Sequence, residues 1–539
     1  MQISRRDLFK TGAVVGGALA FRGILSPGIA EAAVTGSRAL AATSFDTVLL
    51  RGDANESGWR PIVTGPGEPH LVRPGLGTKA LAGREATRQG LLAFVQLSDV
   101  HICDHQSPMR FESQDPNISS SAYRPQEMLT AHIAESMVRE INAVAAGPVT
   151  GLPLAHAVQT GDNSDNGQYN EIRWNIDILD GGEIRPDSGD LTKYEGVMNV
   201  DWDPDKSTYP NFWHPEIAAA ADSKYATFPA VPGLLDAARQ PFQATGLAMK
   251  WYTAMGNHDP LVQGNFPKSP SFNAIATGTK KAGHTVTADP NRKMISHKEW
   301  VDEHFTTTKE PAGHGFTAQN KAKGTAYYTF DDDQGGAVRF IVLDTTNPNG
   351  LQHGSLDKAQ FAWLQAQLKK ATTDKKLVVL ASHHTISTMR KKDAPSQGIK
   401  DRVFGQTVRK ELIKHQNVIL WVNGHTHTNH IWPHPATKNG KPTGRGFWEV
   451  NTASHIDWPQ QSRIVEIVDN GDGTLSIFAT MLDHGAPLEF SGDLTDPMQL
   501  AALGRELAAN DWQEQSHDRR GDVNARNVEL IVKAPSFLA

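Results

Sequence analysis

Short apolar runs that end in polar, chemistry-bearing residues recur along the chain. The clearest covers residues 417–422 and is followed by Gly424, His425 and His427. A run that is apolar on both faces is typical of a strand buried in the middle of an α/β sheet. Gly424 allows a sharp backbone turn, after which both imidazoles can point to one place. Imidazole is the commonest metal ligand, but alone this pair predicts a metal site only weakly, because surface or core histidines give the same pattern.

The same pattern predicts other strands in chain order, with helices between them. Strands are expected at residues 91–97, 154–160, 249–255, 325–330, 338–343, 377–381 and 417–422. Helical spacing of apolar residues predicts helices over 124–145, 355–371 and 403–415. Ser355 is the expected N-cap of the second of these helices. Three further strands, at 447–452, 463–468 and 474–481, are expected to pair antiparallel with one another.

Two segments fall outside this regular pattern. Residues 168–247 lose clean periodicity and carry Trp174, Trp202 and Trp213. A structureless loop of this length is uncommon, and tryptophans indicate packing, so the segment is predicted to cap the site. The main domain is expected to cover residues 42–487. Residues 488–539 are expected to be a tail with one helical run at 498–509.

The composition is that of an ordinary globular protein with material for a large core. The chain has 539 residues, of which 39% are hydrophobic and 21% charged. The net charge of −6, without a polybasic block, gives no indication of binding to nucleic-acid polymers. The single cysteine, Cys103, excludes a disulfide framework within the chain.

Residues 1–41 are predicted to be a twin-arginine export signal with its processing region. Arg5 and Arg6 precede a small-residue apolar run, 11–21, which is too short to span a bilayer. Cleavage could follow Ala32 or Ala41, and the alternative is a basic helix start on a cytoplasmic protein. No later apolar run reaches membrane-spanning length. We therefore expect export machinery as a partner, and a protein that is periplasmic, cell-wall associated or secreted.

Metal-competent side chains follow the apolar runs, and ligand sites in open α/β sheets lie outside the carboxyl ends of strands. The set comprises two carboxylates, one carboxamide and four imidazoles: Asp99, His101, Asp162, Asn257, His383, His425 and His427. Mixed nitrogen and oxygen donors suit Mn, Fe or Zn, while the lack of thiolates argues against a closed structural zinc site. Seven donors exceed what one ion needs. One carboxylate that bridges two ions about 3.5–4 Å apart would account for the excess.

These residues resemble the calcineurin-like metallophosphoesterases. The blocks are D-x-H at 99–101, G-D at 161–162, G-N-H-D at 256–259, the strand-end His383 and G-H-x-H at 424–427, in the family order. The resemblance covers about 94–481 except the insertion, and with its signal the chain is similar to an exported bacterial branch. It implies an α/β fold, a four-layer sandwich of two mixed β-sheets flanked by helices, with a dinuclear metal site along their shared edge.

The resemblance also implies a role for each donor. One ion would be held by Asp99, His101 and His427, the other by Asn257, His383 and His425, with Asp162 as the bridge. His258 would stand beside the scissile phosphate as general acid or charge donor, with Asp259 fixing its ring. His384 could replace His383. Further neighbours are expected around the ligands or at the surface: Cys103, Asp104, His105, Arg110, Asp165, His430 and His455.

The implied activity is hydrolysis of a small phosphoester, in which a metal-bound hydroxide attacks phosphorus in line. Purple acid phosphatases place a tyrosine three residues after the bridging aspartate, where this chain has Asp165. The block G-D-N-S-D-N-G is similar instead to that of cyclic-nucleotide and glycerophosphodiester phosphodiesterases, which favours a phosphodiesterase. The alternatives are a phosphomonoesterase of the same family and a non-enzymatic envelope binding protein. His258, which would serve only turnover, argues against the last.

Overall fold

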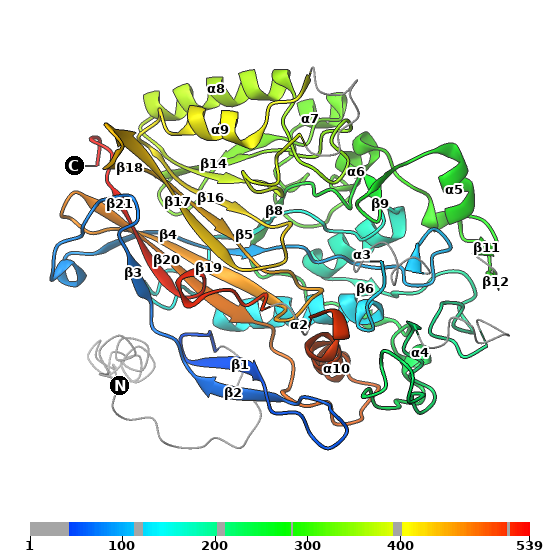
Figure 1. Ribbon diagram of the computed structural model, residues 1–539. Coiled ribbons are helices and arrows are strands. Elements are labelled where there is room, and N and C mark those ends of the chain that lie inside the picture. The colour runs from blue at the N-terminus through cyan, green and yellow to red at the C-terminus, as the bar shows by residue number, and fades with distance from the viewer. Residues whose placement is uncertain are drawn as a thin grey trace, which may run out of the picture.

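Two mixed β-sheets pack face to face, and helices cover the outer side of each (Figure 1). The computed structural model describes residues 42–112, 122–201, 211–281, 284–391, 401–514 and 518–538. The predicted export signal, residues 1–41, lies outside these ranges. The layers of helix, sheet, sheet and helix confirm the predicted fold class.

The first sheet has six strands in the order β13-β14-β15-β16-β18-β17. Their bounds are β13 Tyr328–Asp331, β14 Val338–Val342, β15 Leu377–Ala381, β16 Val418–Asn423, β17 His430–Lys438 and β18 Lys441–Asn451. The four strands from β14 to β18 are parallel to one another, whereas β13 and β17 are antiparallel edge strands. Every residue of β14, β15 and β16 is buried, as the apolar runs predict.

The second sheet has seven strands in the order β3-β21-β20-β19-β4-β5-β8. Their bounds are β3 Leu71–Arg73, β4 Gln89–Leu97, β5 His156–Gln159, β8 Lys250–Thr253, β19 Gln461–Asp469, β20 Thr474–Asp483 and β21 Val528–Lys533. Strands β4, β5 and β8 are parallel, and β19, β20 and β21 continue the sheet in antiparallel pairs. The carboxyl ends of β4, β5 and β8 therefore meet at one edge.

Apolar and polar contacts join the two sheets. Phe94 on β4 packs edge-on against Phe340 on β14, with 5.1 Å between ring centroids. Near the site, the Gln96 side chain donates a hydrogen bond to the carbonyl of Asn423, at the end of β16, at 2.9 Å. This bond fixes the end of one sheet against the end of the other.

Helices form the two outer layers. Their bounds are α2 Thr130–Val144, α3 Tyr169–Asp180, α8 Lys358–Thr373, α9 Gly405–Leu412 and α10 Pro497–Asn510. Helices α8 and α9 bury their apolar side chains against the six-stranded sheet. Helices α2 and α3 pack on the seven-stranded sheet, and α10 packs against α2 (Figure 1).

Short helices and two-stranded pairs lie outside the two main sheets. The helices are α4 Leu234–Ala237, α5 Pro270–Ala276, α6 His297–Glu303 and α7 Ala318–Lys323. Two-stranded pairs form from β1 Thr47–Arg51 with β2 Ile62–Pro66, β6 Glu183–Ile184 with β7 Phe242–Gln243, β9 Leu261–Val262 with β10 Phe266–Pro267, and β11 Lys280–Lys281 with β12 His284–Thr285. In the described ranges, no helix is both long and apolar enough to cross a membrane.

Three details of the predicted elements are wrong. Asp357, not Ser355, caps α8, since its carboxylate accepts the backbone N–H of Gln360 at 2.6 Å. Residues 447–452 do not join the closing antiparallel strands. Residues 447–451 lie in β18 of the other sheet, parallel to β16. Strand β17 was not predicted, because its two prolines, Pro433 and Pro435, argue against a strand except at a sheet edge, which is where it lies.

The two irregular segments are more ordered than their sequences indicate. Residues 168–180 include the regular helix α3, which a capping box of Gln168 and Glu171 begins. In the described part of 181–247, side chains pack around Trp213 and Tyr225 against α10 and the start of α2, whereas Trp202 lies outside the described residues. The C-terminal segment is not a simple tail, because β21 is an inner strand of the seven-stranded sheet.

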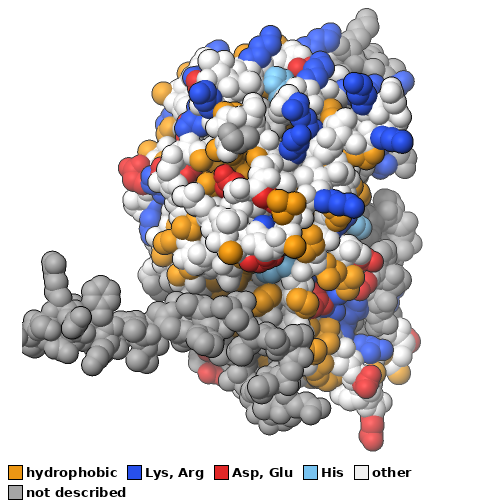
Figure 2. Space-filling model, turned by 90° about the vertical axis from the view of Figure 1, so that its left-hand side faces the viewer, with side chains coloured by type: hydrophobic (Ala, Val, Ile, Leu, Met, Phe, Trp, Pro, Cys, Tyr) orange, Lys and Arg blue, Asp and Glu red, His pale blue; other side chains and the backbone are white. Residues whose placement is uncertain are grey.

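The surface carries charges of both signs. On the face shown in Figure 2, Lys and Arg side chains are scattered among uncharged ones and do not join into one stripe. This distribution agrees with the absence of a polybasic block in the sequence.

Candidate metal centre

The predicted ligands lie at the ends of strands, on backbone that bends sharply. Five of the seven, Asp99, His101, Asp162, His425 and His427, have φ between 49° and 75°. This left-handed conformation costs energy in residues other than glycine and is concentrated at functional sites. Backbone hydrogen bonds hold it in place, for example from the His101 N–H to the Asp162 carbonyl at 2.9 Å. The bends direct the side chains into one space between the sheets.

Four of the donors form a first cluster. The ligand atoms of Asp99, His101, Asp162 and His427 all lie within 4.8 Å of one another. His101 Nε2 is 3.2 Å from His427 Nε2, and His427 Nε2 is 3.3 Å from Asp99 Oδ1. Imidazole nitrogens that face each other and a carboxylate at such distances can share one cation.

The other donors surround His383. Its Nε2 is 2.9 Å from Asn257 Oδ1, 3.2 Å from His425 Nδ1 and 3.2 Å from Asp162 Oδ2. The same Asp162 oxygen is 3.6 Å from His101 Nε2 in the first cluster. The structure therefore brings all seven predicted ligands together, and Asp162 lies between the two groups as a bridging ligand would.

The second nitrogen of each of three imidazoles has a protein partner. His101 Nδ1 is 3.0 Å from Asp165 Oδ1, His427 Nδ1 is 2.6 Å from Asp457 Oδ2, and His383 Nδ1 is 3.0 Å from the Thr160 carbonyl. These acceptors fix the ring tautomers, so that Nε2 presents its lone pair to the centre. The donor set thus fits two divalent ions, while the identity of the metal stays a prediction.

The buried carboxylates favour positive charge at the centre. Burial lowers the pKa of His383, but Asp162 and Asp99 outweigh this and raise the pKa to about 9. Burial likewise opposes protonation of His427, yet Asp99 and Asp457 raise its pKa to about 9. Metal ions would replace these protons and supply the positive charge that the carboxylates attract.

His258 lies where the sequence places it, but Asp259 does not fix its ring. The His258 ring stands edge-on to His101, with 4.5 Å between centroids, and its Nδ1 is 2.7 Å from the Asp165 carbonyl oxygen. The Asp259 carboxylate instead accepts the backbone N–H groups of Asn163, Ser164 and Gly256. Its position corrects the predicted role, because these three bonds point it at the backbone of the ligand loops and away from the ring.

The neighbouring residues take different places. His384 belongs to the same histidine group, but its Nδ1 pairs with Thr345 Oγ1 at 2.8 Å, and His383, not His384, faces Asp162. Asp165 contacts both His101 and His258, while Arg110 contacts Asp165 and Cys103. The others lie farther out. Asp104 binds Arg292, His105 stacks on Tyr194, His430 stacks on Trp432, and His455 pairs with Ser462.

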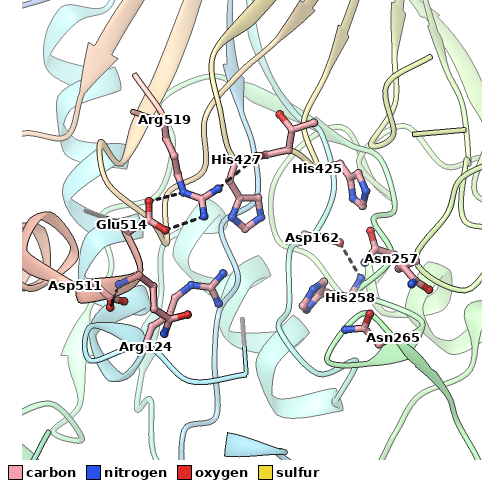
Figure 3. A pocket seen from close by; sticks show the side chains of 13 residues that line it. Arg124, Asp162, Asn257, His258, Asn265, His425, His427, Asp511, Glu514 and Arg519 are labelled. Carbon is pink, nitrogen blue, oxygen red and sulfur yellow. Dashed lines mark hydrogen bonds and ion pairs between the residues drawn. The ribbon is translucent and has the colours of Figure 1, made fainter. Parts of the chain in front are cut away.

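A cavity of about 250 Å³ opens beside this cluster. Figure 3 shows the metal-ligating side and a second, charged side. The lining residues are Arg124, Asp162, Asn257, His258, Asn265, Gln352, His425, Thr426, His427, Asp511, Gln513, Glu514 and Arg519. The described part of 168–247 contributes none of them. Residues near the C-terminus bound this cavity, and the described part of 168–247 packs on α10. The cap over the site stays a prediction.

Asp457 contacts the predicted ligand His427, and the sequence analysis did not identify this residue. Besides His427, it accepts hydrogen bonds from Arg124, whose Nε is 2.5 Å from Asp457 Oδ1. Arg519, Glu514 and Arg124 were equally missed as cavity residues. None of these residues follows an apolar run in a recognisable block, and no local pattern marks them.

Comparisons with known proteins bear on the class of enzyme. Residues 233–429, which carry the last three of the five blocks, match the family model of the calcineurin-like phosphoesterases. The chain is a metal-dependent phosphoester hydrolase. No curated protein matches the sequence.

Three solved structures show some similarity to the chain. A dimetal phosphatase from Danio rerio is 12% identical, with 74% of this chain and 100% of that chain covered and a TM-score of 0.36. A purple acid phosphatase from yellow lupin (Lupinus luteus) seeds is 10% identical over 79% of this chain and 55% of that chain, with a TM-score of 0.31. The structure of PhoD is 12% identical over 78% and 68%, with a TM-score of 0.31.

Replacing Asp162 tests the shared carboxylate. We expect Asp162→Asn to lose most phosphoesterase activity and to bind less metal, because an amide cannot offer one charged oxygen to both clusters. Metal content by elemental analysis and turnover of a chromogenic ester would be compared with the wild type. A near-normal rate and metal content would contradict the two-metal assignment.

Replacing Asp457 tests the support of His427. We expect Asp457→Asn to weaken metal binding about 10- to 100-fold, since the partner of a ligating histidine sets its tautomer and basicity. Competition with a chelator measures this affinity. Asp333→Asn is the matched control, because Asp333 is an exposed carboxylate paired with Lys250 at the opposite end of β8. Equal affinities in the two variants would show that Asp457 does not act on the metal.

Proposed function

We propose that this protein is an exported phosphodiesterase that uses two divalent metal ions. The observation that carries the dinuclear assignment is the position of Asp162, one oxygen of which faces His101 and His383 together. When bound, two ions would supply a Lewis acid and an activated nucleophile for displacement at phosphorus. The remaining steps depend on residues of this chain.

His258 is placed to move a proton. Its Nδ1 lies 2.7 Å from a backbone carbonyl, which only accepts hydrogen bonds, so this nitrogen carries hydrogen and the ring also lines the cavity. Burial lowers the pKa of His258, but Asp162 and Asp165 outweigh it and raise the pKa. A protonated ring beside the phosphate position can donate to the leaving oxygen, which is the role of a general acid.

Two features support a diester substrate. The block Gly161 to Gly167 resembles that of phosphodiesterases, and Asp165 stands where a ferric-iron tyrosine would stand in purple acid phosphatases. The cavity also extends past the metal ligands to a second wall around Arg519, so a phosphate held at the centre has space for a second ester arm. A volume of about 250 Å³ suits a small ester, since it lies near the lower end of ligand pockets, roughly 300 Å³.

Export is the second part of the proposal. It is supported by the paired arginines Arg5 and Arg6 and by the apolar run that follows them. Twin-arginine routes carry folded cargo, which suits a protein whose ligands come from five distant blocks and must assemble before metal can bind.

A panel of esters tests the substrate class. After chelation and reloading with Mn, Fe, Zn or Mg, we expect a higher kcat/KM for bis(4-nitrophenyl) phosphate than for 4-nitrophenyl phosphate, because the second arm adds binding energy remote from phosphorus. A preference for the monoester with every metal would identify the protein as a phosphomonoesterase instead.

Replacing His258 tests the proton donor. We expect His258→Ala to keep both metals and lose on the order of 10²–10⁴ in rate, the usual contribution of a positioned general acid. The control is His430→Ala, which removes a half-buried imidazole stacked on Trp432. Loss of metal from the His258 variant would show that this residue is a ligand.

A further inference from the structure

The side of the cavity opposite the metal ligands has no part in the proposed proton transfer or metal binding. It is formed by Arg124, Asp511, Glu514 and Arg519, here called the C-terminal wall (Figure 3). Arg124 lies just before α2, whereas the other three follow α10. The fold therefore brings together two segments that are almost 400 residues apart in the chain.

The C-terminal wall is a built site and not a loose surface. The Arg519 guanidinium donates from Nε to Glu514 Oε2 at 2.5 Å and from Nη2 to Glu514 Oε1 at 2.7 Å. Such a two-bond pair fixes the geometry of both groups. Asp511 is 1% exposed and Glu514 3% exposed. The polar atoms of the wall are thus held in place before any substrate arrives.

The wall adjoins the metal centre directly. Asp457 Oδ2 is 2.6 Å from His427 Nδ1 and 3.7 Å from Arg519 Nη2, and Asp457 Oδ1 accepts a hydrogen bond from Arg124. One carboxylate therefore separates the predicted metal ligand His427 from both arginines. An ester arm attached to a phosphate at the centre needs to extend by only a few atoms to reach the wall.

The charges of the wall are balanced. Arg519 is paired with Glu514, and Arg124 is paired with Asp457. A wall without surplus positive charge does not favour an anionic arm. The described lining residues include no Phe, Tyr, Trp, Leu, Ile, Val or Met, so they provide no apolar surface for an acyl chain.

Hydroxyl groups fit this wall better than other small groups. Carboxylates only accept hydrogen bonds and guanidinium groups only donate them, whereas a hydroxyl does both. Adjacent hydroxyls on one arm can donate to Glu514 and accept from Arg519 or Arg124. Hydrogen bonds to charged partners are the stronger ones, so each hydroxyl contributes to selectivity.

We propose that the C-terminal wall binds an ester arm that is a neutral polyol, of the glycerol or sugar class. The inference rests on the proposed diesterase function and names the alcohol that the second arm carries. It assigns the selection of that arm to the polar pair Glu514 and Arg519.

Two diesters that differ only in hydroxyl groups test the inference. They are 4-nitrophenyl glyceryl phosphate and 4-nitrophenyl propyl phosphate, assayed with the metal-loaded full-length protein. We expect a kcat/KM for the glyceryl ester at least about tenfold higher, because two hydroxyls gain charged partners. Glu514→Gln and Arg519→Gln should each bring this ratio toward one.

A neighbouring arginine provides the control. Arg520→Gln should keep the wild-type ratio, because Arg520 does not line the cavity and its Nη2 lies 3.5 Å from Glu68. Turnover of both esters at equal kcat/KM would overturn the assignment of the wall and leave the diesterase function standing. A wild-type ratio in both Glu514→Gln and Arg519→Gln would also overturn the assignment of the wall.

Binding without turnover gives a second measurement, and it separates the two proposals. Glycerol 3-phosphate should bind the metal-loaded protein at least about tenfold more tightly than propyl phosphate by calorimetry, and Glu514→Gln should remove this difference. If neither diester is hydrolysed, the proposed diesterase function is wrong. The difference in affinity between the two monoesters then still tests whether the wall binds hydroxyl groups. Equal affinities for the two monoesters would overturn the polyol assignment.

Discussion

The structure depends on two buried carboxylates, Asp99 and Asp162, which the fold places among imidazoles. A buried carboxylate without a compensating charge is strongly destabilising, so its surroundings must supply protons or metal ions. Burial alone would raise the pKa of Asp162, yet His383 and His258 hold it well below its usual range. The left-handed backbone at Asp99 and Asp162 brings this about, because it turns both side chains off their strands toward the histidines of the other sheet. Histidines from both sheets are therefore needed to balance the charge of the Asp162 carboxylate.

Chemistry and selectivity come from different parts of the chain. The metal ligands stand at the ends of inner strands, where Gln96 and Asn423 join the two sheets and leave little freedom. Three of the four residues of the C-terminal wall stand on the segment after α10, and the fourth, Arg124, lies just before α2. The segment after α10 is anchored because β21 returns into the seven-stranded sheet. Residues on the wall can therefore vary without disturbing the strand ends, which suits a scaffold that serves different esters.

The sequence predicts best what depends on local pattern. Residues 377–381 form β15 with the expected bounds, and the ligand blocks lie at strand ends, because strands apolar on both faces occur only inside such sheets. Residues that act through tertiary contact leave no such pattern. Asp457 reaches His427 only because the chain folds back after β18, and Glu514 reaches Arg519 beside a cavity that distant segments enclose. Helix α3 was missed because the Pro- and Gly-rich residues after it hide its spacing.

Asp165 explains why the departure from the purple acid phosphatase pattern is compatible with an intact site. Burial raises the pKa of this carboxyl, but Arg110 and His101 outweigh it and keep the group charged. A charged acceptor at His101 Nδ1 leaves Nε2 of that ring free of hydrogen and directed at the first cluster. Through its backbone carbonyl the same residue orients His258. One residue that is not itself placed as a ligand thus sets both a metal-facing nitrogen and the proton donor, so the positions of the two rings are linked.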